Sequence, residues 1–233
     1  MDEHQGTDMQ IWLDTIDFSL IRHARQLGLL AGVTTNPSIL AAAKQPVESV
    51  LDALLDLQPG KLAVQVTCDD SASQLRQARR LAAKSDRIVI KIPAIGDGFQ
   101  TMAALEREGI PTLATAIFES RQIVMAGLLG VHYAAPYLNR IEQAGRDAAL
   151  LLQESQQILQ RQGKRTLIMG AAVKSLEQFM QCARAGIGAV TLPADTYRQL
   201  FASTPDVDAA LARFDSAWQA NPFTARSALF LTE

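Results

Sequence analysis

The chain has 233 residues, of which 48% are hydrophobic and 20% charged. It can therefore bury a large core and lacks the low hydrophobicity and high net charge of disordered proteins. Its formal net charge of -2 argues against a nucleic-acid partner, since nucleic-acid binding normally needs a strongly basic surface.

Membrane and export signals are not evident. No apolar run approaches the roughly 18 residues needed to span a bilayer. The first ten residues, MDEHQGTDMQ, are acidic and polar, unlike a secretory signal with its basic start and apolar centre. Cys68 and Cys182 lie far apart without metal-type spacing, so we expect two reduced thiols, no membrane partner and a cytoplasmic location.

Short apolar runs rich in Val, Ile and Thr alternate along the chain with segments of helical period. The runs predict strands at 11–15, 32–36, 62–67, 88–93, 112–118, 132–137, 166–172 and 189–193. Apolar residues recur every third or fourth position at 71–84, 98–109, 120–130, 146–163 and 175–186, which predicts amphipathic helices. Glycine ends the last four of these segments, as is common at the carboxyl ends of helices.

This alternation, repeated about eight times without a linker, is typical of a (β/α)8 TIM barrel. We therefore expect α/β class and a single domain over residues 1–233 with extra C-terminal helices. A doubly wound open sheet has the same alternation, and periodicity does not separate the two. Beyond the eighth strand, the sequence predicts two more helical segments, which run through LARFDSAWQA (211–220) to a final SALFLTE. The apolar cluster Leu229, Phe230 and Leu231 predicts packing against the barrel or a neighbouring subunit.

Polar residues interrupt strands that should be almost continuously apolar, because both faces of a parallel barrel strand are covered. They lie in or at the carboxyl half of six strands: Asp14, Thr34, Asn36, Gln65, Lys91, Thr115 and Tyr137. Barrel active sites are built at that end, from several strands. Lys91 is the most unusual, because a buried ammonium without partners is costly, and a lysine amine in a pocket can condense with a carbonyl to form a Schiff base.

Each of these residues also has a structural interpretation. Lys91 could be a rim residue whose stem packs while its amine reaches water. Asp14 could cap the helix that begins near Asp17, and Asn36 could serve the turn before Pro37. The threonines are ordinary strand residues, and Gln65 and Tyr137 could be core residues with satisfied polar tips. The convergence of seven such residues favours a site. The three histidines lack ligand spacing, so we expect no metal.

Five segments carry a resemblance to a known family: LDT (13–15), GVTTNPSIL (32–40), IVIKIPA (88–94), EGIPTLATAIF (108–118) and YAAPYLNRIE (133–142). They resemble the motifs of the transaldolase family, especially of its short branch that includes the fructose-6-phosphate aldolases. The resemblance implies a class I aldolase barrel with a lysine Schiff base on the fourth strand. It also implies no metal or organic cofactor, and assembly into a large homo-oligomer, a pentamer or decamer.

The resemblance also assigns roles by position. Lys91 corresponds to the Schiff-base lysine, with Asp14, Tyr137 and Gln65 as further catalytic residues. Residues expected to bind the substrate, a small sugar or sugar phosphate, are Thr34, Asn36, Thr115, Arg140 and Lys174. Arg140 matches the arginine that meets the phosphate, for which its planar guanidinium is suited.

Two positions bear on the reaction within the family. Transaldolases resembling this chain typically have glutamate on the third strand and phenylalanine after the sixth, where Gln65 and Tyr137 stand here. This pair is associated with the fructose-6-phosphate aldolases, so we expect cleavage or formation of fructose 6-phosphate from dihydroxyacetone and glyceraldehyde 3-phosphate. The alternative is a transaldolase of the pentose phosphate pathway that passes the dihydroxyacetone unit to another sugar phosphate. A non-catalytic barrel that binds sugar phosphates is a third possibility.

Two segments depart from the family pattern. Family members usually carry a phosphate-binding serine after the seventh strand, where GAAVK (170–174) places Ala172. Arg140, Lys174 and backbone N–H groups of that loop could still bind the anion. The segment EQAGRDA (142–148) stands where the family usually has a glycine-rich stretch, and this departure bears on how the acceptor is recognised.

Overall fold

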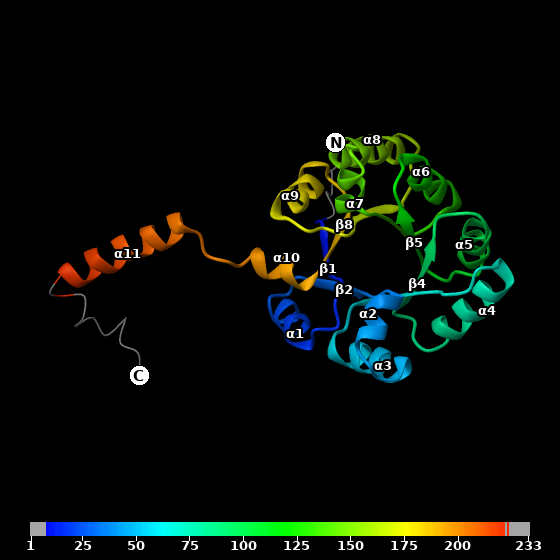
Figure 1. Ribbon diagram of the computed structural model, residues 1–233, viewed down its shortest axis with the longest axis horizontal. Helices are drawn as coiled ribbons and strands as arrows, with labels where there is room; N and C mark the ends of the chain where they lie inside the picture. Colours follow the sequence, from blue (N-terminus) through cyan, green and yellow to red (C-terminus); the bar gives the residue numbers. More distant parts are fainter. Residues whose placement is uncertain (1–7, 222, 224–233) are drawn as a thin grey trace, which may run out of the picture. The chain divides into compact units, whose positions relative to one another are not determined.

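Eight parallel strands close into a barrel in the computed structural model, which describes residues 8–221 and 223 (Figure 1). The strands are β1 (Gln10–Leu13), β2 (Leu30–Thr34), β3 (Lys61–Gln65), β4 (Ile88–Pro93), β5 (Thr112–Ile117), β6 (Tyr133–Pro136), β7 (Leu167–Gly170) and β8 (Ala189–Leu192). Each strand pairs with its neighbours in sequence, and β1 pairs with β8. The predicted (β/α)8 barrel is confirmed, and the open-sheet alternative is wrong.

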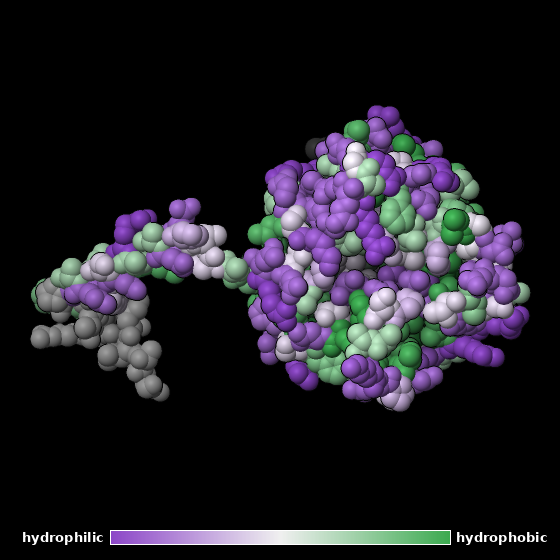
Figure 2. Space-filling model, in the orientation of Figure 1, coloured by the Kyte–Doolittle hydropathy of each residue, from purple (hydrophilic) through white to green (hydrophobic). Residues whose placement is uncertain are grey.

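Helices surround this barrel (Figure 1). They are α1 (Phe18–Gln26), α2 (Pro37–Ala42), α3 (Val47–Leu57), α4 (Ser71–Ala82), α5 (Asp97–Arg107), α6 (Ser120–Leu129), α7 (Leu138–Gln143), α8 (Ala148–Arg161) and α9 (Leu176–Arg184). Side chains of Asp17, Asn36, Asp70, Asp147 and Ser175 accept backbone N–H groups at the helix starts, which satisfies donors that the helix leaves free. Polar side chains dominate the face of the barrel seen in Figure 2, with smaller apolar patches between them.

Several strands end earlier than the sequence predicts. Asp14, Asn36 and Tyr137 lie just beyond the ends of β1, β2 and β6, because the chain turns there toward the next helix. Asn36 is the N-cap of α2 and Tyr137 the N-cap of α7. Asp14 does not cap α1, whose N-cap is Asp17.

The barrel interior is filled by a buried apolar cluster of Trp12, Ala63, Val89, Leu113, Tyr133, Ala135, Met169, Ala171 and Ala189. Trp12 is fully buried, packs edge to face on Tyr133 with ring centroids 5.3 Å apart, and donates its indole N–H to Gln10 Oε1 at 3.2 Å. Gly32 gives the indole room. A Cβ at position 32 would lie 2.6 Å from the Trp12 ring and 2.5 Å from the carbonyl oxygen of Lys61.

Both cysteines are free thiols, as predicted. Cys182 is buried on α9, and this burial raises its pKa to about 12. Cys68 is half-buried in the segment between β3 and α4. The thiolate is the reactive form of cysteine, so Cys182 is a packing residue of the shell around the barrel.

The described chain divides into two compact units, one ending at Tyr197 and one beginning at Arg198. The boundary falls within α10 (Ala194–Gln199). The second unit contains α11 (Pro205–Ala220), which has no buried residue. Its exposed Val207, Leu211, Phe214 and Trp218 recur at three and four positions and therefore share one face. The cluster Leu229, Phe230 and Leu231 lies outside the described residues, and none of the described helices is both long and apolar enough to cross a membrane.

Replacing Gly32 with alanine should lower the free energy of unfolding by more than about 2 kcal/mol, because the added methyl meets the Trp12 ring and a backbone carbonyl. Gly109→Ala is the control. Its position has a φ of +72° but nothing within 4 Å of the added Cβ, so only about 1 kcal/mol of backbone strain is expected. Urea unfolding of both variants measures the difference, and equal losses would contradict the steric explanation.

Candidate active site

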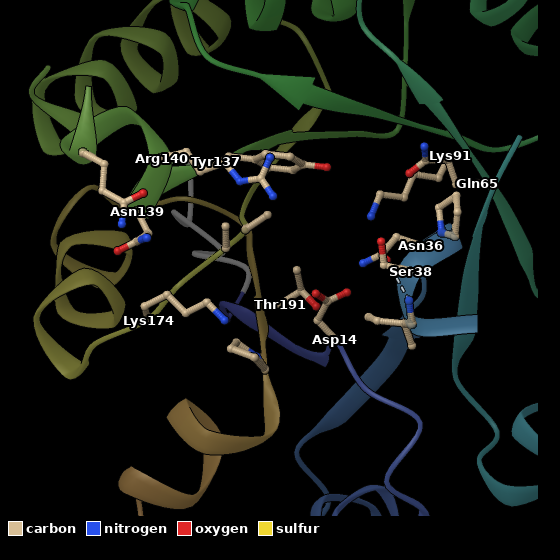
Figure 3. Close-up of a pocket in the computed structure, with 16 residues that line it drawn as sticks. Asp14, Asn36, Ser38, Gln65, Lys91, Tyr137, Asn139, Arg140, Lys174 and Thr191 are labelled. Carbon is tan, nitrogen blue, oxygen red and sulfur yellow. Dashed lines mark hydrogen bonds between the residues drawn. The ribbon is translucent and has the colours of Figure 1, made fainter. Parts of the chain in front are cut away.

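A cavity of about 620 Å³ lies at the carboxyl ends of the strands (Figure 3). Seven of the predicted site residues line it: Asp14, Asn36, Gln65, Lys91, Tyr137, Arg140 and Lys174. Gln65 and Lys91 lie on β3 and β4. The others lie in the segments that follow β1, β2, β6 and β7. The predicted convergence of polar strand ends at one site is therefore present in the fold.

Lys91 rises from the middle of β4 and is only 5% exposed. Its amine donates to the backbone carbonyl oxygen of Thr35 at 3.2 Å and points into the cavity in Figure 3. Gln65 is its register partner on β3. Among the described residues, no carboxylate lies within 4.0 Å of the Lys91 amine. A buried amine with one carbonyl partner retains a lone pair or N–H groups for a ligand in the cavity.

Asp14 is held by a chain of hydroxyl groups. The Thr34 hydroxyl donates to Asp14 Oδ1 at 2.6 Å and lies 2.8 Å from the Thr191 hydroxyl on β8. Thr34 is buried and does not line the cavity, whereas Asp14 and Thr191 do. The short bond to a charged acceptor fixes the Asp14 carboxylate.

Tyr137 is fixed from three sides. Its hydroxyl lies 2.9 Å from the Thr115 hydroxyl, with either group as donor. Its ring packs edge to face on Phe118 with centroids 5.6 Å apart, and the Arg140 guanidinium lies 5.2 Å from the ring centroid. Thr115 is fully buried and does not line the cavity. In Figure 3 the phenol oxygen points toward the middle of the cavity.

Asn36 serves the turn before Pro37, as its structural interpretation predicts, and it also lines the cavity. Its Oδ1 accepts the backbone N–H of Ile39 at 3.0 Å, which caps α2 directly before Pro37. Because the cap uses the oxygen, the NH₂ group of the same amide is available to donate to a ligand. Capping thus sets the polarity that Asn36 presents to the cavity.

Arg140 and Lys174 form the cationic end of the cavity, opposite Lys91 (Figure 3). Arg140 lies on α7 and Lys174 in the loop between β7 and α9, and both side chains are exposed. Ala172, in the same loop, lines the cavity with a φ of +51°, a left-handed conformation that costs a residue with a Cβ about 1 kcal/mol. The backbone N–H of Lys174 already donates to Gln178 Oε1 at 2.6 Å, so it is not free for an anion.

The cavity carries an excess of positive charge. Among the described residues that line it, the only carboxylate is Asp14, whereas Arg140 and Lys174 are two exposed cations. A cavity of one sign attracts a ligand of the opposite sign. Within residues 8–221 and 223, no three His, Cys, Asp or Glu side chains are grouped so as to hold a metal ion.

Four polar lining residues were missed by the sequence interpretation: Ser38, Asn139, Gln143 and Thr191. Thr191 had a signal, because it is a polar residue in the apolar strand AVTLP, two positions after the inward-facing Ala189. The other three lie on α2 and α7, where a polar residue has no distinguishing pattern. Of the segment 142–148, only Gln143 lines the cavity, while Arg146 donates to the carbonyl oxygen of Phe118 at 2.9 Å.

A closed (β/α)8 barrel with a buried lysine and a fixed carboxylate at the carboxyl ends of its strands belongs to the class of barrel enzymes. The family comparison gives the particular kind. Residues 11–227 match the family Transaldolase/Fructose-6-phosphate aldolase, and the chain belongs to this family. It is therefore an enzyme of the aldolase/transaldolase type, whose general chemistry is that of a Schiff-base aldolase.

Thr34→Val should lower kcat about tenfold, because a hydrogen bond to a charged group contributes about 1.5 kcal/mol and its loss frees the Asp14 carboxylate. The matched control is Thr35→Val. Thr35 is also buried, but its hydroxyl donates to the carbonyl oxygen of Ala63 at 2.9 Å, which also accepts a backbone N–H. Steady-state kinetics compare the two, and equal losses of kcat would remove the argument for Asp14.

Proposed function

We propose that this enzyme is a fructose-6-phosphate aldolase, which cleaves fructose 6-phosphate to dihydroxyacetone and glyceraldehyde 3-phosphate or joins them. The observation that carries the proposal is the Tyr137 hydroxyl, held by Thr115 in the same cavity as the buried Lys91 amine. We further propose that the enzyme acts as a homo-oligomer in the cytoplasm and that its barrel and C-terminal helix form one domain.

Lys91 is the nucleophile. Its unprotonated amine attacks the keto carbon of the ketose, the resulting carbinolamine takes up one proton from solvent and loses water, and a protonated imine bound to the lysine remains. The single hydrogen bond to the Thr35 carbonyl aligns the amine without blocking it. Holding amine and carbonyl at bonding distance supplies much of the rate advantage of such a step.

Asp14 serves the cleavage of the C3–C4 bond. As that bond breaks, the C4 hydroxyl loses its proton, the C4 carbon leaves as the aldehyde, and the electron pair moves into the imine to give an enamine. A carboxylate accepts this proton directly or through a water. The Thr34 hydroxyl fixes the Asp14 carboxylate for this step, and the amide NH₂ of Asn36 donates to a hydroxyl of the donor sugar.

Tyr137 and Gln65 direct the fate of the enamine. A water ordered by the Tyr137 hydroxyl and the Gln65 amide protonates C3, and hydrolysis of the resulting imine releases dihydroxyacetone and restores Lys91. Fast protonation favours release of the free ketone over transfer to a second aldehyde. Arg140 and Lys174 bind the phosphate of the sugar, because both are cations on the opposite side of the cavity from Lys91.

The second candidate is a transaldolase, which would keep the enamine until an acceptor aldehyde arrives. The same Lys91 and Asp14 serve both reactions. Ala172 lines the cavity beside Lys174, where both reactions would bind a sugar phosphate, so it does not separate them. The candidates differ only in whether water or an aldehyde captures the enamine.

Dihydroxyacetone with borohydride should add one covalent adduct to the wild-type chain, on Lys91, because borohydride reduces the imine to a stable amine. Peptide mass spectrometry locates the adduct. Lys91→Met should remain unmodified. Lys174→Met is the matched control, since Lys174 is the other lysine that lines the cavity, and it should be labelled normally. Equal labelling of Lys91→Met would overturn the mechanism, and an unlabelled wild type would favour a non-catalytic sugar-binding barrel.

Fructose 6-phosphate alone should release glyceraldehyde 3-phosphate at a rate that erythrose 4-phosphate does not control, because water captures the enamine. A coupled dehydrogenase assay follows the product with and without the acceptor. Tyr137→Phe should shift the enzyme toward dependence on the acceptor, since it removes the hydroxyl but keeps the ring contacts. Strict dependence in the wild type would make the enzyme a transaldolase.

A further inference from the structure

Gln178 is a buried polar residue that the mechanism does not use. It lies in the first turn of α9, is 4% exposed, and does not line the cavity. A buried amide must have its hydrogen bonds satisfied, because an unpartnered buried polar group costs about 1 to 3 kcal/mol. Its partners therefore show what the side chain holds in place.

The amide of Gln178 joins two segments. Its Oε1 accepts the backbone N–H of Lys174 at 2.6 Å. Its Nε2 donates to Glu142 Oε2 at 2.5 Å and, more weakly, to Asn139 Oδ1 at 3.4 Å. Lys174 belongs to the loop after β7, and Glu142 and Asn139 belong to α7. One side chain thus connects the loop to the helix.

These two segments carry the cationic end of the cavity. Arg140 lies between Asn139 and Glu142 on α7, and Lys174 is bonded to Gln178 through its own backbone. Both cations have exposed side chains, so their backbone positions determine where their charges can meet an anion. A shift of about 1 Å in such groups is enough to weaken a positioned contact.

Gln178 also affects charge. Glu142 lies two residues from Arg140, and its carboxylate is half-buried and does not line the cavity. The bond from Gln178 Nε2 retains that carboxylate on the side of α9. A carboxylate free to turn toward the cavity would repel a phosphate and compete for the two cations.

We infer that Gln178 is a positioning residue for phosphate recognition, setting the distance between Arg140 and Lys174 and holding the Glu142 carboxylate away from the anion. This inference rests on the proposed function, in which these two cations bind the sugar phosphate. It concerns KM for phosphorylated substrates and leaves the Schiff-base chemistry at Lys91 unchanged.

The chain offers a matched control in Gln74. It is 5% exposed and lies in the first turn of α4. Its Nε2 donates to the carbonyl oxygen of Cys68 at 2.9 Å, and its Oε1 accepts the Thr101 hydroxyl at 2.8 Å. Gln74 therefore ties the loop after β3 as Gln178 ties the loop after β7, but it contacts neither α7 nor Lys174. Methionine at either position removes three side-chain hydrogen bonds at similar volume.

The test measures condensation of dihydroxyacetone with glyceraldehyde 3-phosphate and with unphosphorylated glyceraldehyde. Gln178→Met should raise KM for the phosphorylated aldehyde about tenfold, with kcat within about twofold and KM for glyceraldehyde unchanged. Gln74→Met should change the two KM values equally or not at all. Labelling of Lys91 by dihydroxyacetone and borohydride should be normal in both variants.

An exchange of the pair provides a second variant if Gln178→Met does not fold. Gln178→Glu alone retains an acceptor for the Lys174 N–H but sets two carboxylates against each other, and it should raise KM for the phosphorylated aldehyde. Adding Glu142→Gln restores the hydrogen bond in reverse polarity with the wild-type net charge. The double variant should return KM to within about threefold of wild type.

Three results would overturn the inference. They are an equal rise in KM for both aldehydes in Gln178→Met, no rise for the phosphorylated aldehyde, and no recovery in the exchanged pair. A wild type that does not prefer the phosphorylated aldehyde would instead overturn the proposed phosphate site, and this inference with it. An unlabelled wild type would overturn the Schiff-base proposal and favour a non-catalytic sugar-binding barrel, in which the condensation assay would show no turnover.

Discussion

Side chains two residues apart on a barrel strand point to the same side, and the site depends on this constraint. Trp12, Ala63, Val89 and Leu113 belong to the apolar interior. Two positions further along the chain stand Asp14, Gln65 and Lys91, which line the cavity, and Thr115, whose hydroxyl bonds to Tyr137. The apolar layer excludes water from below, and the polar layer above it forms the floor of the cavity. Lys91 is buried because it faces the same side of β4 as Val89 and lies directly above this apolar layer.

The polar layer is held by neighbours that do not touch the cavity. Buried Thr34 and Thr115 bind Asp14 and Tyr137, and the Thr35 carbonyl binds Lys91. Side chains whose rotamers are fixed in this way lose little entropy when a ligand binds. The closed barrel supports Lys91 and Asp14, whereas the cations Arg140 and Lys174 stand on α7 and on a loop.

The alternation of apolar runs with amphipathic segments predicts the barrel, and the polar layer is predicted because a polar residue within a buried strand is conspicuous. The predicted residues Lys91, Gln65 and Asp14 line the cavity. The sequence does not predict that Thr34 and Thr115 act by holding Asp14 and Tyr137, since this depends on which strands lie side by side. Nor does it single out Gln178, because a glutamine on an amphipathic helix resembles a solvated residue until its three partners are assembled from separate segments.

Backbone strain and glutamine contacts coincide near the carboxyl ends of β5 and β7. Ala116 and Ala172 have φ values of +54° and +51°, a conformation that costs about 1 kcal/mol for a residue with a Cβ. Gln122 donates to the carbonyl oxygens of Ala116 at 3.1 Å and Ala94 at 2.9 Å, and Gln178 accepts the N–H two residues after Ala172. Each net hydrogen bond contributes about 1 kcal/mol, so these contacts are of the right size to offset the strain. The left-handed position at Ala172 lies between β7 and Lys174 and is occupied without a glycine, whose conformational freedom would loosen the loop.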